Sequence, residues 1–232
     1  MLLRNFYCDI SLHSVMIQAE KMRLNYLRRA SIIATILSFA PFVRMIALTG
    51  SLARGEATEK SDIDFFVVLK RGRLWSGRAF VSLFAHLTGL RRYEEKIAGR
   101  ICLNCFQTED HLLVGPKTLK NARDYANLII LYQRDQLARK FFQANQWIPA
   151  KGYRFQNSNI TPRQLIIPIL IRWLTEALYE LLFSNWGEKQ LRSFQIRRIL
   201  NDPRTQMSSQ GQIYISDQEL RFHPPKGEIE ST

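Results

Sequence analysis

Two aspartates and a glycine–serine corner are the residues of this chain best suited to chemistry. They fall in the stretch ALTGSLARGEATEKSDIDFFVVL, residues 47–69. Asp62 and Asp64 open an apolar run, and side chains two apart on a strand share a face, so both carboxylates should point the same way. Aspartate is a poor strand former, so this pair needs a reason. Paired carboxylate oxygens suit Mg²⁺, which binds one or two carboxylates together with phosphate oxygens.

The corner at Gly50 and Ser51 predicts a phosphate site. Gly50 has no side chain, so a phosphate could approach its backbone closely. Ser51 is expected where a short helix begins, and the free N–H groups at the start of a helix attract anions. Arg54 follows at once and is a further candidate to meet a phosphate. The corner and the two aspartates together predict a site for a metal-bound nucleoside triphosphate.

The segments around these residues alternate between strand and helix. Strands are expected over residues 44–49, 62–69 and 100–106, and a helix over residues 75–87. A helix over residues 14–40, ended by Pro41, precedes them. The alternation predicts an α/β (α+β) core with a small mixed sheet.

The character of the chain changes after residue 115. Four helices are expected, over residues 118–134, 136–146, 162–184 and 188–200, followed by a polar tail with a short strand at 213–215. We therefore divide the chain into an N-terminal helical segment (1–41), an α/β core (42–115) and a helical C-terminal module with a polar tail (116–232).

The stretch GSLARGEATEKSDIDFFVV resembles the signature of the nucleotidyltransferase superfamily, typified by DNA polymerase beta. The shared pattern is an apolar strand, Gly-Ser, a spacer of about ten residues and Asp-x-Asp before an apolar run. The resemblance covers roughly residues 42–115 and implies that Gly50 and Ser51 hold the triphosphate. It also implies that Asp62 and Asp64 bind the catalytic metal, with two Mg²⁺ ions possible. The family reaction moves a nucleoside monophosphate from a triphosphate, here expected to be ATP, to a hydroxyl and releases pyrophosphate.

The sequence departs from this family at the third carboxylate, which the superfamily usually carries on a neighbouring strand. The strand expected at 100–106 offers Cys102 and Asn104 instead. Asn104 could ligate a metal through its amide oxygen, but it cannot act as a base. Four acids outside the strand are alternatives: Glu94, Glu95, Glu109 and Asp110. The departure leaves open a second function, a nucleotide-binding or regulatory module with impaired catalysis.

An excess of positive charge leaves a third function open, that of a basic RNA-binding protein. The chain has 33 basic and 20 acidic side chains, a net charge of +13, and most of the excess follows residue 115. Such a balance fits a polyanionic partner and equally a merely basic soluble protein. Arg192, Arg197 and Arg198, with Phe194 between them, are candidates for contact with RNA, although a solvated helix face is the commoner explanation.

The remaining motifs favour a protein of the cytoplasm. Cys102 and Cys105 have the spacing of a zinc or redox pair, but they are expected to be small core residues on opposite faces of a strand. Three cysteines argue against a disulfide framework and for a reducing compartment. The apolar stretch 165–183 contains Arg172, Glu176 and Glu180, so a buried helix is expected there and no membrane span. The acceptor (a small molecule, a protein or RNA) and the oligomeric state have no signature in the sequence.

Overall fold

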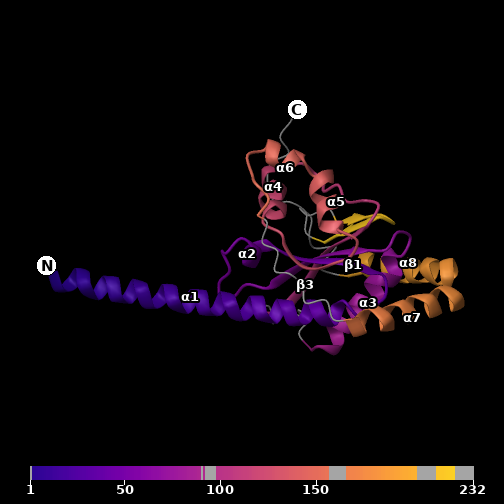
Figure 1. Ribbon diagram of the computed structural model, residues 1–232, viewed down its shortest axis with the longest axis horizontal. Coiled ribbons are helices and arrows are strands. Elements are labelled where there is room, and N and C mark those ends of the chain that lie inside the picture. The colour runs from indigo at the N-terminus through magenta and orange to yellow at the C-terminus, as the bar shows by residue number, and fades with distance from the viewer. Residues whose placement is uncertain (1, 90, 92–97, 157–165, 203–212, 223–232) are drawn as a thin grey trace.

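A mixed six-stranded sheet forms the centre of the protein (Figure 1). The computed structural model describes the backbone of residues 2–89, 91, 98–156, 166–202 and 213–222. The strand order is β4-β1-β2-β3-β6-β5, and only β2 and β3 are parallel neighbours. The strands are β1 (Val43–Thr49), β2 (Ile63–Leu69), β3 (Ile101–Thr108), β4 (Ile129–Gln133), β5 (Tyr214–Ile215) and β6 (Glu219–Arg221). The expected α/β fold with a small mixed sheet is confirmed.

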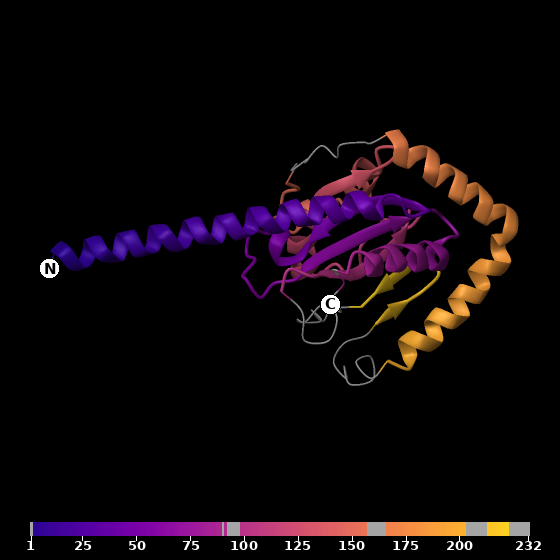
Figure 2. The same cartoon turned by 90° about the horizontal axis from the view of Figure 1, so that it is seen from below.

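Helices cover both faces of this sheet (Figures 1 and 2). One face packs against the C-terminal part of α1, α3 and α8, and the other against α4, α5 and α6. The N-terminal part of α1 projects away from the body, and α7 and α8 wrap around one end of it. The helices are α1 (Leu2–Leu37), α2 (Gly50–Ala53), α3 (Leu74–Leu87), α4 (Leu119–Ala126), α5 (Leu137–Ala144), α6 (Trp147–Ala150), α7 (Ile166–Leu182) and α8 (Ser184–Leu200).

Strand β2 has apolar side chains on both faces because the sheet is covered on both sides. Phe65 and Val67 enter the core beneath α1 and α3, while Phe66 and Val68 enter the core beneath α4 and α5. All four side chains are fully buried. Since side chains alternate along a strand, Asp64 shares a face with Phe66 and is directed to the side of the sheet that carries α4–α6.

The helix expected over residues 118–134 is wrong in its second half. Helix α4 ends at Ala126, and residues 129–133 form β4, which pairs antiparallel with β1. A short run of apolar residues such as Ile129–Leu131 has no periodicity that separates a buried strand from a buried helix. The hairpin of β5 and β6 then extends the sheet beyond β3, so strands on both sides of residue 115 complete it.

The expectation of a buried helix at residues 165–183 is also wrong, because α7 lies on the surface with its acids turned inward. Glu176 accepts hydrogen bonds from both terminal nitrogens of Arg44, at 2.9 and 3.0 Å, and from the backbone N–H of Phe42 at 2.8 Å. Glu180 accepts hydrogen bonds from Lys70 at 3.1 Å and from Arg73 Nε at 3.0 Å. These acids therefore attach α7 to the core instead of facing water.

The start of α8 is attached in a similar way. Glu188 accepts hydrogen bonds from the backbone N–H groups of Trp75 and Ser76, at 2.7 and 3.0 Å, and so caps the first turn of α3. In the part of the chain that the structure describes, no helix is long and apolar enough to cross a membrane.

Candidate active site

The pairing of β1 with β2 brings the glycine–serine corner next to the two aspartates. The strands are antiparallel, with Thr49 opposite Asp64, so the end of β1 and the start of β2 meet at one edge of the sheet. Gly50 follows Thr49 directly and opens the short helix α2. The corner and the acids, separated by a polar connector in the sequence, are therefore neighbours in space, as the sequence predicted.

Gly50 and Asp64 are in such close contact that only glycine fits this position. The backbone of Gly50 has a φ of 71°, in the left-handed region that side chains disfavour. A methyl group in place of its hydrogen would lie 2.2 Å from Oδ2 of Asp64. The glycine therefore leaves room for the carboxylate beside the backbone. Helix α2 has only four residues, so any attraction for a phosphate here would come from the backbone of the half-buried corner more than from a helix dipole.

The carboxylates of Asp62 and Asp64 converge, and the thiol of Cys102 joins them. One ligand atom from each residue lies within 4.8 Å of the others, and all three residues are half-buried. The parallel register of β2 and β3 sets Cys102 directly beside Asp64. The expectation that both carboxylates share a face is confirmed, whereas the expectation that Cys102 is a core residue is wrong.

Asn104, the candidate metal ligand on β3, also contacts Asp64. Its side-chain N–H group donates to Oδ1 of Asp64, and its oxygen accepts from the Cys102 thiol at 2.7 Å. In this arrangement Asn104 orients the carboxylate. Its role as a metal ligand stays a prediction.

Cys105 is a core residue, as expected, but not on the face expected. The pairing register of β2 and β3 shifts between Phe65 and Phe66. This irregularity places Cys105 in the core beneath α4 and α5, on the same side of the sheet as Cys102. Burial raises the pKa of the Cys105 thiol to about 12, so this group is neutral and unreactive at physiological pH.

Arg54 lies at the same edge, and two carboxylates hold its guanidinium. Nε donates to Glu56 at 2.8 Å and Nη1 to Asp124 of α4, and Arg123 contacts Glu56 in turn. Burial opposes the charge of Arg54 and lowers its pKa, but the hydrogen bonds to Glu56 and the charge of Asp124 outweigh it, so the pKa is raised. This network fixes the corner to α4. The sequence did not indicate Asp124, which is far from Arg54 along the chain.

Two of the four acids considered as a third carboxylate are at the wrong end of the sheet. Glu109 and Asp110 follow the C-terminal end of β3, whereas Asp62 and Asp64 are at the N-terminal end of the parallel strand β2. Glu109 contacts Arg44 at 3.7 Å and Asp110 contacts Arg71 at 3.2 Å. The other two acids, Glu94 and Glu95, lie outside the described residues.

The basic cluster of α8 is on the opposite side of the sheet from the acids. Helix α8 packs with α3, and its Ile199 belongs to the core beneath α1 and α3. Asp64 faces the other side. Arg192 is paired with Asp217 at 2.6 Å, and Phe194 is exposed. Whatever these residues contact, they do not line the aspartate site.

The donor set at the edge fits a hard divalent cation. Two carboxylates that converge on one point, here beside the backbone of Gly50, are the ligands by which proteins hold Mg²⁺ together with phosphate oxygens. The thiol of Cys102 is a softer group that suits transition metals. Asp62 and Asp64 are thus the residues that would hold the ion, and Cys102 is the feature that sets this site apart from an all-oxygen one.

Comparison with protein families agrees with this geometry. Residues 30–126, from the end of α1 to the end of α4, match the family model described as nucleotidyltransferase domain. The match covers less than half of the chain. It includes the corner, both aspartates, β3 and α4, so the resemblance to the nucleotidyltransferase superfamily is confirmed. Comparisons with curated proteins and with solved structures gave no significant match.

Proposed function

We propose that the protein is a Mg²⁺-dependent nucleotidyltransferase that moves a nucleoside monophosphate from a triphosphate, ATP in the first instance, to a hydroxyl acceptor and releases pyrophosphate. The observation that carries the proposal is the convergence of Asp62 and Asp64 beside Gly50, within the segment that matches the nucleotidyltransferase domain model. Two ions are possible at such a pair of carboxylates, and the acceptor is a small molecule, a protein or RNA.

Each residue of the edge has a role in this scheme. Gly50 and Ser51 offer backbone that a phosphate can approach without meeting a large side chain. Asp62 and Asp64 hold the metal, which when bound neutralises charge on the phosphates during in-line displacement. Asn104 holds the Asp64 carboxylate in place through its hydrogen bond. Arg54, held beside the corner by Glu56 and Asp124, is the basic side chain placed to meet a phosphate there.

One observation favours a second candidate, a nucleotide-binding module with impaired catalysis. The side chains on β3 beside Asp64 are Cys102 and Asn104, and neither is a carboxylate that could accept the proton of the attacking hydroxyl. Such a module would bind Mg²⁺-nucleotide without turnover. Both candidates predict binding of a non-hydrolysable triphosphate in calorimetry, whereas only the first predicts transfer, so an assay of transfer separates them.

The test is label transfer from α-labelled triphosphates to acceptors in a cell extract. The wild-type protein should transfer label in the presence of Mg²⁺, and Asp62→Asn together with Asp64→Asn should abolish transfer. Asp110→Asn is the matched control, since it removes an acid at the other end of the parallel strands and leaves the site intact. Transfer that survives the double substitution, or wild-type protein that binds no nucleotide, would refute both candidates.

A further inference from the structure

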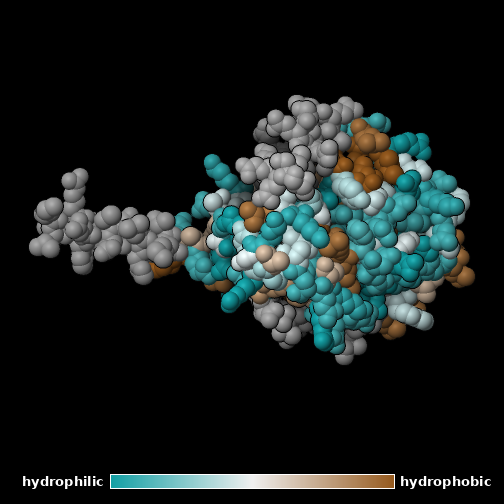
Figure 3. Space-filling model, turned by 90° about the horizontal axis from the view of Figure 1, so that it is seen from above, coloured by the Kyte–Doolittle hydropathy of each residue, from teal (hydrophilic) through white to brown (hydrophobic). Residues whose placement is uncertain are grey.

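The outer surface of α7 and the start of α8 is apolar. In the described part of the chain, almost half of the large exposed apolar side chains fall within residues 170–186. The most exposed is Leu181 at 80%, followed by Trp186 at 65% and Trp173 at 64%. Leu181, Leu182 and Trp186 stand where α7 gives way to α8, at the bend visible in Figure 2. On the face seen in Figure 3, hydrophilic residues predominate around smaller hydrophobic patches. Apolar surface of this extent marks an interaction site.

The orientation of α7 creates this surface. The three glutamates of α7 and α8 are Glu176, Glu180 and Glu188, and all three turn inward to Arg44, Arg73 and the first turn of α3. The leucines on the other side of α7 are consequently left facing outward. An amphipathic helix normally buries its apolar side against the protein. Burial of the leucines would contribute more hydrophobic free energy to folding than the observed orientation of α7 does.

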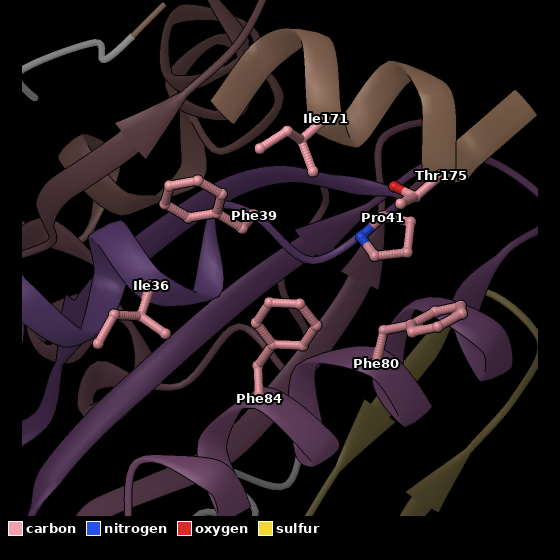
Figure 4. Close-up of a pocket in the computed structure, with 7 residues that line it drawn as sticks. All are labelled: Ile36, Phe39, Pro41, Phe80, Phe84, Ile171 and Thr175. Atoms are coloured by element: carbon pink, nitrogen blue, oxygen red, sulfur yellow. The ribbon is translucent and has the colours of Figure 1, made fainter. Parts of the chain in front are cut away.

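An apolar cavity opens beside α7 (Figure 4). Its volume is about 320 Å³, and side chains from three helices line it. Phe80 and Phe84 come from α3 and Ile36 from α1, while Ile171 and Thr175 come from α7. Ile36 and Ile171 are 37% and 45% exposed, so the cavity is continuous with the apolar surface. With Thr175 as its one polar side chain, it suits hydrocarbon better than water or a polar ligand.

Positive charge lies beside this apolar surface, on α8. Lys189 and Arg197 are exposed on α8, on the same stripe of the helix as Trp186. On the other side of the bend, Arg73 donates to Asn185 at 3.0 Å, so the loop that carries Lys70 and Arg71 lies alongside, where Lys70 is paired with Glu180 and Arg71 with Asp110. A second copy of a chain with net charge +13 would bring like charges together here. RNA would match the charge but not the leucines.

We propose that the outer surface of α7–α8 binds the surface of an anionic lipid bilayer. Leu181, Leu182 and Trp186 would enter the boundary between headgroups and acyl chains, where tryptophan is favoured. Lys189 and Arg197 would contact the anionic headgroups, and each such contact strengthens binding in a salt-dependent way. The cavity beside Ile171 offers space for part of an acyl chain. The helices lie on the membrane and do not cross it.

The test is sedimentation of the full chain with two kinds of vesicle. One kind contains phosphatidylcholine alone, and the other also contains about 30% phosphatidylglycerol, an anionic lipid that attracts basic segments. We expect binding to the anionic vesicles at least tenfold tighter than to the neutral ones, and weaker in high salt. Leu181→Ser with Leu182→Ser and Trp186→Ser should reduce binding at least tenfold. Leu119→Ser with Leu113→Ser, exposed apolar residues outside this surface, should not.

A second readout follows the tryptophans directly. Trp173 and Trp186 should be quenched by lipids brominated in the upper acyl chain, and the quenching should be lost in the triple variant. Equal binding to neutral and anionic vesicles, or no binding to either, would overturn the proposal. A dimer in light scattering that Leu181→Ser dissociates, or binding to RNA that the triple variant loses, would assign the surface to another partner and overturn it as well. None of these outcomes depends on nucleotidyl transfer.

Discussion

Two regions of the molecule carry acidic side chains in opposite ways. At the edge of the sheet, Asp62 and Asp64 converge beside the backbone of Gly50, and Asn104 donates a hydrogen bond to Asp64. On α7, Glu176 and Glu180 are each bound by arginine from the core. The first pair is arranged to attract a cation from solution, whereas the second already has its cations within the protein.

The difference shows that the groups around an acidic side chain determine its role. Carboxylates that converge repel each other, so a ligand that carries positive charge stabilises the pair. Carboxylates that meet guanidinium groups stabilise the fold and have no charge left to offer a ligand. Substitutions in the first region should therefore change chemistry with little effect on stability, and substitutions in the second should do the reverse.

The largest effect is expected from Asp64→Asn. Removing one metal ligand should lower the rate of nucleotidyl transfer by about 10²-fold or more, the scale on which a site loses its electrostatic stabilisation. The melting temperature should hardly fall, because the two carboxylates no longer repel each other. Glu180→Gln is the comparison, and it should leave the rate of transfer unchanged. A rate loss of equal size in both variants would erase the distinction between the two regions.

Gly50→Ala should displace the Asp64 carboxylate, because the new methyl group would lie 2.2 Å from its Oδ2. We expect the rate of transfer to fall about 10²-fold, the effect of displacing a catalytic group by about 1 Å. We also expect the free energy of unfolding to fall by about 1–2 kcal/mol, because alanine disfavours the left-handed backbone conformation. Gly72 has a similar φ of 67° and no atom within 4 Å of the added methyl. Gly72→Ala should therefore show the stability loss alone, and the comparison of rate and unfolding for both variants separates the clash from the strain.

Glu176→Gln should destabilise the protein by about 2 kcal/mol without slowing the chemistry. The side chains of Arg44 and Glu176 are only 9% and 12% exposed, so the substitution leaves a nearly buried guanidinium with a weaker partner. Urea unfolding would measure the loss. Glu20→Gln, in an exposed pair with Arg23, is the control and should change stability by less than about 0.5 kcal/mol.

The attachment of α7 should also weaken in acid. Burial raises the pKa of Glu176, but the hydrogen bonds and charge of Arg44 outweigh it, so the net pKa is lowered; the hydrogen bond from Arg73 lowers the pKa of Glu180. A carboxyl whose pKa is lowered by folding stabilises the protein fully above its unfolded pKa, and that stability is lost as the pH falls through the folded pKa. When the melting temperature is measured from pH 7 to pH 3, it should therefore start to fall once the pH drops below about 4.5. The Glu176→Gln variant should show a smaller fall. Identical curves would contradict the assignment.

The smallest effect is expected from Cys102→Asp, which places a third carboxylate beside Asp64. If transfer is slow because the site lacks a general base, the new carboxylate should raise the rate severalfold. The gain should stay well below the full effect of general base catalysis, about 10²-fold or more, because the surroundings of the new carboxylate do not adjust its pKa for this role. Cys102→Asn is the control of similar size. A lower rate in Cys102→Asp would show that the thiol itself serves the reaction.

The sequence predicted that the corner and the two acids lie together because these parts are local. The corner at Gly50 and the acids at Asp62 and Asp64 belong to one hairpin, and an antiparallel hairpin brings the end of one strand to the start of the next. Period-two alternation then sets both carboxylates on one face. The central strands and the helices between them were found for the same reason, since each has its own periodicity and its own breakers.

The rest depended on contacts that no local pattern reveals. The register shift between Phe65 and Phe66 decides that Cys102 and Cys105 share a face, and a bulge leaves little trace in the sequence. The apolar run at 129–131 reads equally as helix or strand. The pattern of α7 shows which residues share a side of the helix, but Arg44 and Arg73, more than a hundred residues earlier, decide which side turns inward.

The central claim is that Asp62 and Asp64 bind a divalent cation that carries a triphosphate against Gly50. A crystal of the protein with Mn²⁺ and a non-hydrolysable triphosphate tests it most directly, because Mn²⁺ gives an anomalous signal. We predict a peak about 2.1 Å from oxygens of both aspartates, near the Mg²⁺ distance, with a phosphate on the backbone of Gly50. A nucleotide bound elsewhere, or an edge where both carboxylates stay without metal at saturating Mn²⁺, would contradict the account.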